Sequence, residues 1–303
     1  MSATSDRLRF RPLAPFGIEL DLDLSEPLDD AERARLRELF FAHGLAVFRR
    51  QRLTHPQQVE WMRIFGPVLE TPDGVGYISN DEARGGFGKV ELTFHSDLAF
   101  TPEPFIAISL LAVDVIDGQS ATRFASGSGA FARLPAPLRA RLSALDVLTA
   151  MPTNNATDQV GQPVAPGMPC VVRPAVMTHP VTGASILYLS QMQSVRFEGL
   201  PAQESDALMR EVLAHMYARE AIYEHRWHRG DLVIWDNLAT THARAEVTGT
   251  GPRTLQRVVC ARKSFYELCP QFSQDDPEYM KWLNAQDQTR STLDATLARG
   301  ARR

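Results

Sequence analysis

Two short motifs, far apart in the chain, carry metal-binding side chains and constrain the fold more than any other feature. His95 and Asp97 flank Ser96 in the segment VELTFHSDLAF, and His242 lies in GDLVIWDNLATTHAR. Two imidazoles and one carboxylate are the ligand set of mononuclear iron sites of the facial-triad type, which leave coordination positions open. Residues i and i+2 of a strand point to the same face, so His95 and Asp97 can bind one ion together. Any fold of this chain must therefore bring His242 to the HSD segment.

The other histidines are interpreted as structural, because an isolated histidine is more often hydrogen-bonded in the core or exposed than bound to a metal. His225 and His228 stand close together in the chain, but on a strand their odd spacing places them on opposite faces. His179 precedes Pro180, and we expect it to shape a turn between two strands.

Length, charge and composition indicate an ordinary soluble enzyme. The chain has 303 residues, is 44% apolar and carries a formal net charge of −4. We expect a single domain over 1–303, with a core at about 10–265 and a C-terminal extension of helical composition at about 270–303. Nothing predicts binding to nucleic acid or to a membrane, and no apolar run is long enough to span a bilayer. The N-terminus lacks a signal peptide and the cysteines lack metal-site spacing, so we expect a cytoplasmic protein. A homo-oligomer, either a dimer or a tetramer, is also expected.

The hydrophobic pattern predicts a mainly β fold with flanking helices. A helix is expected from Asp29 to about His43, with Gly44 ending it, and another over 126–145. Short apolar runs between Gly, Pro and Asp residues predict many strands. Two long loops are expected at 71–90 and 152–168. Many short strands with a few helices favour a jelly-roll core supported by helices.

From about residue 10 to about residue 265 the chain resembles the iron(II)- and 2-oxoglutarate-dependent dioxygenases of the taurine and 2,4-dichlorophenoxyacetate dioxygenase (TauD/TfdA) family. A bare HxD pair is a weak signal, but an ordered set of motifs is a strong one. The set comprises FFAHGLAVFRRQRLT, FHSD, GQSATRFASG, THPVTGASILYLS, WHRGDLVIWDNLATTHAR and PRTLQRVV. The resemblance implies a double-stranded β-helix (jelly roll, cupin-like). It also implies iron(II) bound by the catalytic residues His95, Asp97 and His242, with 2-oxoglutarate and dioxygen as co-substrates.

The resemblance also implies which residues bind 2-oxoglutarate. In the family, an arginine eleven residues after the distal histidine binds the second carboxylate of 2-oxoglutarate, and Arg253 stands at that position. A planar guanidinium suits a carboxylate because it can form two parallel hydrogen bonds. The alternative is an exposed arginine in an ion pair of little energetic value. Thr122 matches the threonine that binds the same carboxylate, although two extra residues separate it from the preceding glycine.

Contacts to the primary substrate are predicted at Arg257, Tyr77 and Phe94. Arg257 lies four residues beyond Arg253, on the same face of a strand. The matching arginine of taurine dioxygenase contacts the sulfonate of its substrate, which implies a small anionic substrate here. The alternatives for Arg257 are a role in binding 2-oxoglutarate or a structural ion pair. Tyr77 and Phe94 are candidates for an apolar pocket wall.

Several functions are compatible with these motifs. The first is hydroxylation of an unactivated C–H bond with release of succinate and carbon dioxide. Desaturation or cyclisation in a biosynthetic pathway is possible with the same co-substrates. A halogenase needs an open coordination position where a carboxylate would bind, and Asp97 argues against it. A non-catalytic jelly-roll binding protein would leave Arg253 and Thr122 without a shared purpose. The identity of the substrate does not follow from the sequence.

Overall fold

The computed structural model describes residues 7–71, 74–81, 83, 86–87, 91–155, 157–245, 247 and 251–272. Most of the predicted C-terminal extension, from residue 273 onward, lies outside the described residues. Within these ranges, none of the helices combines the length and the apolar character needed to cross a membrane.

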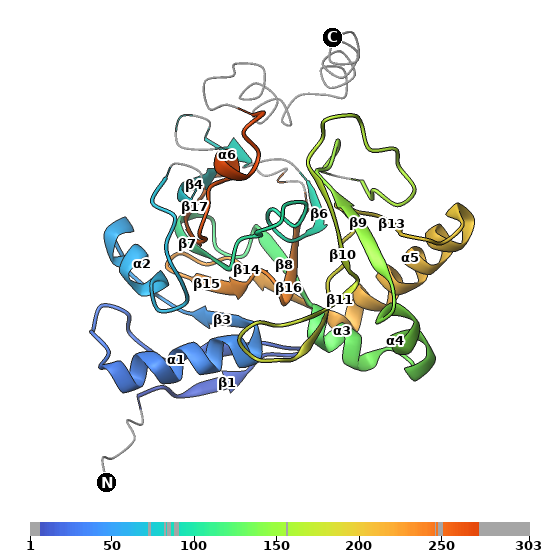
Figure 1. The fold of residues 1–303 in the computed structure, drawn as a ribbon. Helices are drawn as coiled ribbons and strands as arrows, with labels where there is room; N and C mark the ends of the chain where they lie inside the picture. The colour runs from blue at the N-terminus through green and yellow to red at the C-terminus, as the bar shows by residue number, and fades with distance from the viewer. Residues whose placement is uncertain are drawn as a thin grey trace.

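Two sheets form the body of the molecule (Figure 1). The larger has the strand order β1 (Phe10–Pro12), β2 (Ile18–Leu20), β3 (Leu45–Phe48), β15 (Leu232–Asp236), β7 (Ala107–Val115), β17 (Arg253–Cys260), β4 (Val75–Ser79) and β5 (Gly86–Phe87). The smaller has the order β14 (Ile222–Arg226), β8 (Ala121–Ser126), β16 (Thr240–Arg244) and β6 (Leu92–His95). Pairing is antiparallel except between β2 and β3 and between β4 and β5.

The core between the two sheets is formed by large side chains from both. Phe124 of β8 and Tyr223 of β14 belong to the same buried cluster as Trp235 of β15 and Leu255 of β17. Alternate residues of β15, such as Ile234, point to the opposite face and join a second cluster beneath the helices. Because β15 is buried on both faces, its sequence is a continuous apolar run rather than an alternating one. Burial of each such side chain stabilises the fold by about 1.5–3 kcal/mol.

Helices cover the outer face of the larger sheet. In α1 (Asp30–His43), Asp29 and Glu32 form a capping box, and Gly44 ends the helix with a left-handed φ of 71°. The prediction of this helix and of its C-terminal glycine is confirmed. The second helix, α2 (His55–Met62), lies against β17, where Gln58 bonds to the side chain of Gln256.

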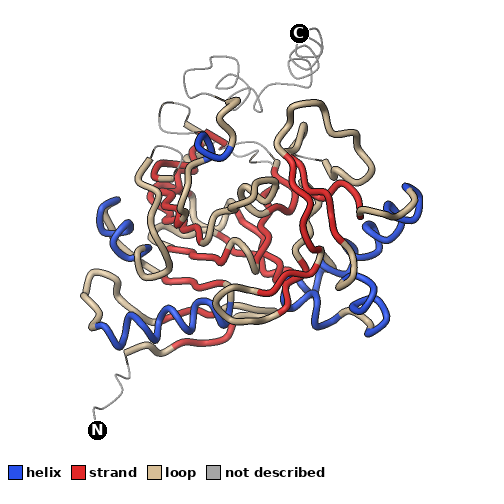
Figure 2. Tube along the Cα trace, in the orientation of Figure 1, coloured by secondary structure: helices blue, strands red, loops and turns tan. Residues whose placement is uncertain are grey.

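Smaller sheets and helices complete the structure. A three-stranded sheet has the order β10 (Cys170–Pro174), β9 (Asp146–Ala150) and β13 (Ser194–Phe197), and β11 (Val176–Thr178) pairs with β12 (Ser185–Leu187). The remaining helices are α3 (Gly127–Arg133), α4 (Ala136–Leu142), α5 (Ala202–Met216), the 3-10 helix η1 (Arg219–Ala221) and α6 (Phe265–Leu268). Strands occupy the interior and helices the periphery (Figure 2). The predicted mainly β fold with flanking helices is therefore confirmed.

Two local predictions were wrong. The helix expected over 126–145 is two helices, because Leu134 precedes Pro135 and adopts an extended backbone with ψ of 145°. The loop expected over 71–90 contains β4, which pairs with β17. By contrast, the described residues of 152–168 contain no helix or strand, in agreement with the predicted loop.

Candidate metal centre

The structure brings together the three residues of the predicted triad. His95 is the last residue of β6 and lies directly opposite His242 of β16 in the antiparallel register. Oδ1 of Asp97 lies 3.4 Å from Nε2 of His95 and 3.6 Å from Nε2 of His242. The three potential ligand atoms all lie within 4.8 Å of one another. Asp97 belongs to the turn that follows β6, so its predicted proximity to His95 is confirmed, whereas its predicted place on the strand is wrong.

Two amide side chains hold the backbone of the HSD segment. Asn237 accepts a 2.8 Å hydrogen bond from the Asp97 N–H and donates one of 2.9 Å to the Asp97 carbonyl. Gln193 does the same for Ser96, at 3.2 and 2.9 Å. The turn includes Leu98, whose φ of 58° is unusual for a residue other than glycine. The two amides therefore fix a strained turn next to the candidate ligands. Sequence analysis missed both of them.

The two imidazoles are oriented by different contacts. Nδ1 of His95 lies 2.8 Å from the carbonyl oxygen of Thr93, so this nitrogen donates and Nε2 is left facing Asp97. The His242 ring packs between aromatic rings, with centroids 4.1 Å from His95 and 4.7 Å from Trp235. Nδ1 of His242 is buried and has no hydrogen-bond partner among the described residues. Packing, rather than a hydrogen bond to a described residue, orients His242.

The electrostatic environment favours the forms that bind a metal. Burial would raise the pKa of Asp97, but the interactions of its carboxylate with His95, His242 and Arg257 outweigh this effect and hold that pKa well below its usual range. Burial, together with the neighbouring His95, lowers the pKa of His242 well below its ordinary value. An ionised carboxylate and a neutral imidazole are the states that bind metal ions. The donor set therefore fits one divalent transition-metal ion.

Arg253 is a buried cation without a counter-ion among the described residues. Its side chain lies on β17 and only 2% of the residue is exposed. Nε and Nη1 of Arg253 have no hydrogen-bond partner in the described part of the chain. Burial lowers the pKa of Arg253 to about 9. A buried guanidinium in this state is costly unless an anion accompanies it.

Thr122 of β8 is 4% exposed. Its Oγ1 accepts a 3.0 Å hydrogen bond from Nε1 of Trp227, which leaves the Thr122 hydroxyl proton available to another acceptor. Ala121 and Arg123, which line a hollow of about 220 Å³ together with Arg253, alternate with Thr122 along β8, so the Thr122 side chain points to the other face of the strand.

Arg257 lies on the same face of β17 as Arg253, as predicted from their spacing. Nη2 of Arg257 donates a 2.8 Å hydrogen bond to Oδ2 of Asp97, and the guanidinium carbon lies 5.6 Å from the Phe105 ring centroid. The side chain is 17% exposed. Arg257 therefore contacts a member of the triad directly.

The structure does not bring Tyr77 and Phe94 to the triad. Tyr77 of β4 pairs with Gln256, so it lies on the opposite face of the sheet from Arg253 and Arg257. Its ring is 39% exposed and lies against His55. Phe94 alternates with His95 along β6 and stacks on Tyr217 at 4.1 Å between centroids.

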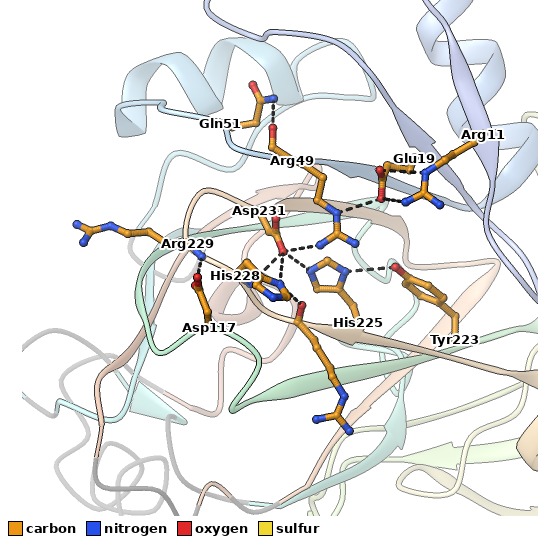
Figure 3. Close-up of polar contacts among 11 residues, drawn as sticks. Arg11, Glu19, Arg49, Gln51, Asp117, Tyr223, His225, His228, Arg229 and Asp231 are labelled. Carbon is orange, nitrogen blue, oxygen red and sulfur yellow. Dashed lines mark hydrogen bonds and ion pairs between the residues drawn. The ribbon is translucent and has the colours of Figure 1, made fainter.

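The remaining histidines of interest belong to hydrogen-bond networks. His179 accepts from the Thr182 N–H at Nδ1 and donates through Nε2 to Asp236 at 2.7 Å, so it shapes the turn as expected. His225 and His228 both contact Asp231, together with Arg49 (Figure 3). Within the described ranges, His95, Asp97 and His242 form the one cluster with metal-ligand geometry.

Comparison with known proteins gives a consistent result. A family model described as "Taurine catabolism dioxygenase TauD, TfdA family" matches residues 9–259. The chain is 30% identical to the alpha-ketoglutarate-dependent 2,4-dichlorophenoxyacetate dioxygenase of Cupriavidus pinatubonensis, over 81% of this chain and 94% of the relative. It is 27% identical to an alpha-ketoglutarate-dependent sulfate ester dioxygenase of Pseudomonas putida, over 82% and 91%. A crystal structure of a taurine dioxygenase from Burkholderia xenovorans superposes with a TM-score of 0.71 at 26% identity, covering 84% of this chain and 91% of that one. The predicted double-stranded β-helix is thereby confirmed.

Proposed function

Because the chain belongs to the taurine catabolism dioxygenase TauD, TfdA family, we propose that it uses iron(II), 2-oxoglutarate and dioxygen to oxidise an unactivated C–H bond of a small organic anion. One oxygen atom of dioxygen enters succinate as carbon dioxide is lost, and the other enters the substrate as a hydroxyl group. The observation that carries this proposal is the close approach of the two imidazoles and the carboxylate, with ligand atoms within 4.8 Å of one another.

His95, Asp97 and His242 are the proposed iron ligands. Iron held by these three residues would supply the activation of dioxygen, and a triad of protein ligands leaves coordination positions open. The hydrogen bond of His95 to the Thr93 carbonyl fixes the ring tautomer, which leaves Nε2 free as a ligand. Asn237 and Gln193 hold the backbone on which Asp97 and His95 depend.

Arg253 and Thr122 are the proposed partners of the distal carboxylate of 2-oxoglutarate. This anion would satisfy the Nε–H and Nη1–H groups of Arg253 that lack partners among the described residues. The Thr122 hydroxyl already accepts from Trp227, so it is set to donate to a carboxylate. Charge-assisted hydrogen bonds from a buried guanidinium would orient 2-oxoglutarate in the site.

The substrate is proposed to be a small anion. The relatives described above are named for a phenoxyacetate and for sulfate esters, both of which carry an acidic group. Arg257 of β17 is still predicted to contact this anion, and its hydrogen bond to Asp97 supports a position beside the metal site. Tyr77 and Phe94 were also predicted to contact the substrate, and their packing against His55 and Tyr217 gives that prediction no support.

A succinate assay tests the proposal. The protein with iron(II), ascorbate and 2-oxoglutarate is screened against aryloxyalkanoates, sulfonates, sulfate esters and amino acids, with His242→Ala as the inactive control. Substrate-stimulated succinate in the unmodified protein, abolished in the control, is expected. The product mass separates hydroxylation, which adds one oxygen atom, from desaturation or cyclisation, which removes two hydrogen atoms. Metal binding without succinate under every condition would instead indicate a non-catalytic binding protein.

The assembly and domain organisation are also proposals. We infer a single domain over 1–303 and a homo-oligomer, either a dimer or a tetramer. Size-exclusion chromatography with light scattering tests the oligomer, because a mass of 33.7 kDa corresponds to one chain. Limited proteolysis tests the domain, which should resist cleavage between about residues 10 and 265.

A further inference from the structure

Several buried polar atoms lack hydrogen-bond partners within the described residues. Those of Arg253 belong to the region assigned above to 2-oxoglutarate. A second group comprises Nε of Arg173, the hydroxyl of Tyr188 and Oγ1 of Thr149. Buried polar groups are normally satisfied, so each exception calls for an explanation. The second group has no role in the proposed function.

The side chain of Arg173 is buried, although the residues before and after it in the strand are exposed. It lies on β10 between the exposed residues Val172 and Pro174, and only 9% of it is exposed. Nη2 donates to the carbonyl oxygen of Thr101, and the guanidinium carbon lies 5.2 Å from the Tyr188 ring centroid. Burial lowers the pKa of Arg173, and no described carboxylate forms an ion pair with it. A buried charge of this kind is expensive without an anion.

Tyr188 connects Arg173 to the metal centre. Tyr188 is 5% exposed and belongs to a buried cluster with Ala99 and Ala239. Ala99 lies two residues after Asp97, and Ala239 lies three residues before His242. Burial, with the nearby charges of Asp236 and Asp97, raises the pKa of Tyr188, so its hydroxyl keeps its proton and can donate. The unpartnered hydroxyl therefore lies close to the triad.

Thr149 lies on the same sheet face as Arg173. In the β9–β10 register Arg173 is opposite Val147 and Val171 is opposite Thr149, so Thr149 and Arg173 are neighbours on one face. That face continues to Met151, which packs against Phe100 in the turn that follows Asp97. The sheet thus presents two of the three unpartnered polar groups toward the segment that carries the candidate iron ligand.

We propose that Arg173, Tyr188 and Thr149 form a subsite beside the triad that binds the acidic group of the primary substrate, a carboxylate, sulfonate or sulfate. This inference rests on the proposed function and assigns the substrate anion partners in addition to Arg257. Nη2 of Arg257 is already bonded to Asp97. The Nε–H of Arg173 and the hydroxyl groups of Tyr188 and Thr149 can each donate to an anion, and an anion bound beside Arg173 would neutralise the buried guanidinium. The proposal accounts for all three unpartnered groups at once.

The test measures anion binding without turnover. The full-length protein is loaded with Mn(II) and saturating 2-oxoglutarate, so that the triad and Arg253 are occupied, in bis-tris propane buffer. Its melting temperature is followed during titration with 4-chlorophenoxyacetate, methanesulfonate or sulfate, against sodium chloride at equal ionic strength. A saturable rise is expected for the unmodified protein with at least one probe. Arg173→Met should weaken the apparent affinity about tenfold or more, as expected for loss of a charged hydrogen bond.

Control variants test whether a change in anion binding is specific to the proposed subsite. Arg196→Met removes an arginine of β13 in the same sheet whose side chain is 49% exposed, and it should keep the full response. Tyr188→Phe should weaken it less than Arg173→Met. Without the probe anions, Arg173→Met should melt no lower than the unmodified protein, because it removes an unpaired buried charge. If Arg173→Met fails to fold, Arg173→Lys takes its place. It keeps the positive charge but loses the planar guanidinium, and it should bind the probe anion several-fold more weakly.

The inference is overturned if the unmodified protein shows no saturable rise with any probe. It is also overturned if Arg173→Met or Arg173→Lys responds as the unmodified protein does, or if the Met variant melts lower while keeping its anion response. Loading by Mn(II) and 2-oxoglutarate is checked separately, because it should raise the melting temperature in the unmodified protein but not in His242→Ala. Failure of that loading contradicts the proposed function, whereas normal loading with an intact response in Arg173→Met contradicts the subsite alone.

Discussion

Arg257 holds Oδ2 of Asp97 at 2.8 Å, while Oδ1 of the same carboxylate lies within 3.6 Å of both histidine Nε2 atoms. The two oxygens of Asp97 therefore have different partners, one cationic and one facing the candidate metal position. A second partner of this kind fixes the orientation of a ligating carboxylate. Arg257 is therefore placed to orient the Asp97 carboxylate.

The first prediction follows from this contact. Arg257→Ala should weaken Mn(II) binding by about 10- to 100-fold, the range seen when a partner of a metal ligand is lost. Titration calorimetry of the metal-free protein measures it. Arg123→Ala, which removes an exposed arginine paired with Glu224, should bind Mn(II) normally. If Arg257→Ala binds Mn(II) as tightly as the unmodified protein, Arg257 does not support the metal site, and only its predicted contact with the substrate remains.

The second prediction concerns Asn237, which bonds to both backbone groups of Asp97. Asn237→Ala leaves the Asp97 N–H without its acceptor, and we expect a loss of about 1–3 kcal/mol in the free energy of unfolding. Mn(II) affinity should fall with it, because the turn that carries Asp97 loses its support. Urea unfolding and metal titration measure the two effects. A destabilised variant with normal metal affinity would show that the turn holds its shape without the amide.

The third prediction separates Arg253 from the metal site. Arg253→Met should raise the KM for 2-oxoglutarate by about two to four orders of magnitude, because breaking a buried charge pair costs about 3–5 kcal/mol. Affinity for Mn(II) alone should change little. Arg123→Met is the matched control on the rim of the same hollow. Equal losses for Mn(II) and 2-oxoglutarate would mean that Arg253 supports the fold of the site rather than the co-substrate.

The fourth prediction concerns Asp231, which is 2% exposed and accepts from Arg49 at 2.7 Å (Figure 3). Asp231→Ala leaves the half-buried Arg49 and the buried His225 without this carboxylate. We expect the free energy of unfolding to fall by up to about 3–5 kcal/mol. Urea unfolding at pH 7 measures this loss. Asp117→Ala, which removes an exposed carboxylate bonded to the Arg229 N–H, should cost much less.

The fifth prediction is a pH dependence of stability. Burial lowers the pKa of His225 below its ordinary value, so between that lowered pKa and about 6.5 the unfolded chain binds a proton that the folded chain does not. Stability should therefore fall as the pH drops below about 6.5. Urea unfolding of the metal-free protein between pH 8 and pH 5 should show a weaker dependence in His225→Gln. Identical slopes in the two proteins would exclude His225 as a source.

Residue types and short-range spacing were enough to predict the triad and the ends of α1. The residue types and spacing of the HSD segment, with His242, identified the triad, and Asp29, Glu32 and Gly44 marked the ends of α1. The prediction for Arg253 rested on its position eleven residues after His242, and its burial on β17 agrees with that prediction without testing its role.

Long-range pairing determines what the sequence did not show. Asn237 contacts Asp97 across 140 residues, and nothing in the residues around either one indicates this contact. The face on which Tyr77 lies depends on its register with β17, which no pattern within β4 specifies. Arg173 stands in an ordinary strand sequence, and its burial depends on the turn that supplies Thr101. Pro135, by contrast, was a visible signal that should have divided the helix predicted over 126–145.

The opposition of His95 and His242 in the β6–β16 register has a consequence for how the protein matures. The two imidazoles face each other only after segments separated by about half of the chain have paired, and such pairings form slowly because a long loop must close first. The growing polypeptide therefore has no complete binding site while β16 is still unsynthesised. Acquisition of iron should follow completion of the chain, and pulse-labelled hydrogen exchange should show protection of β6 and β16 amides before metal uptake.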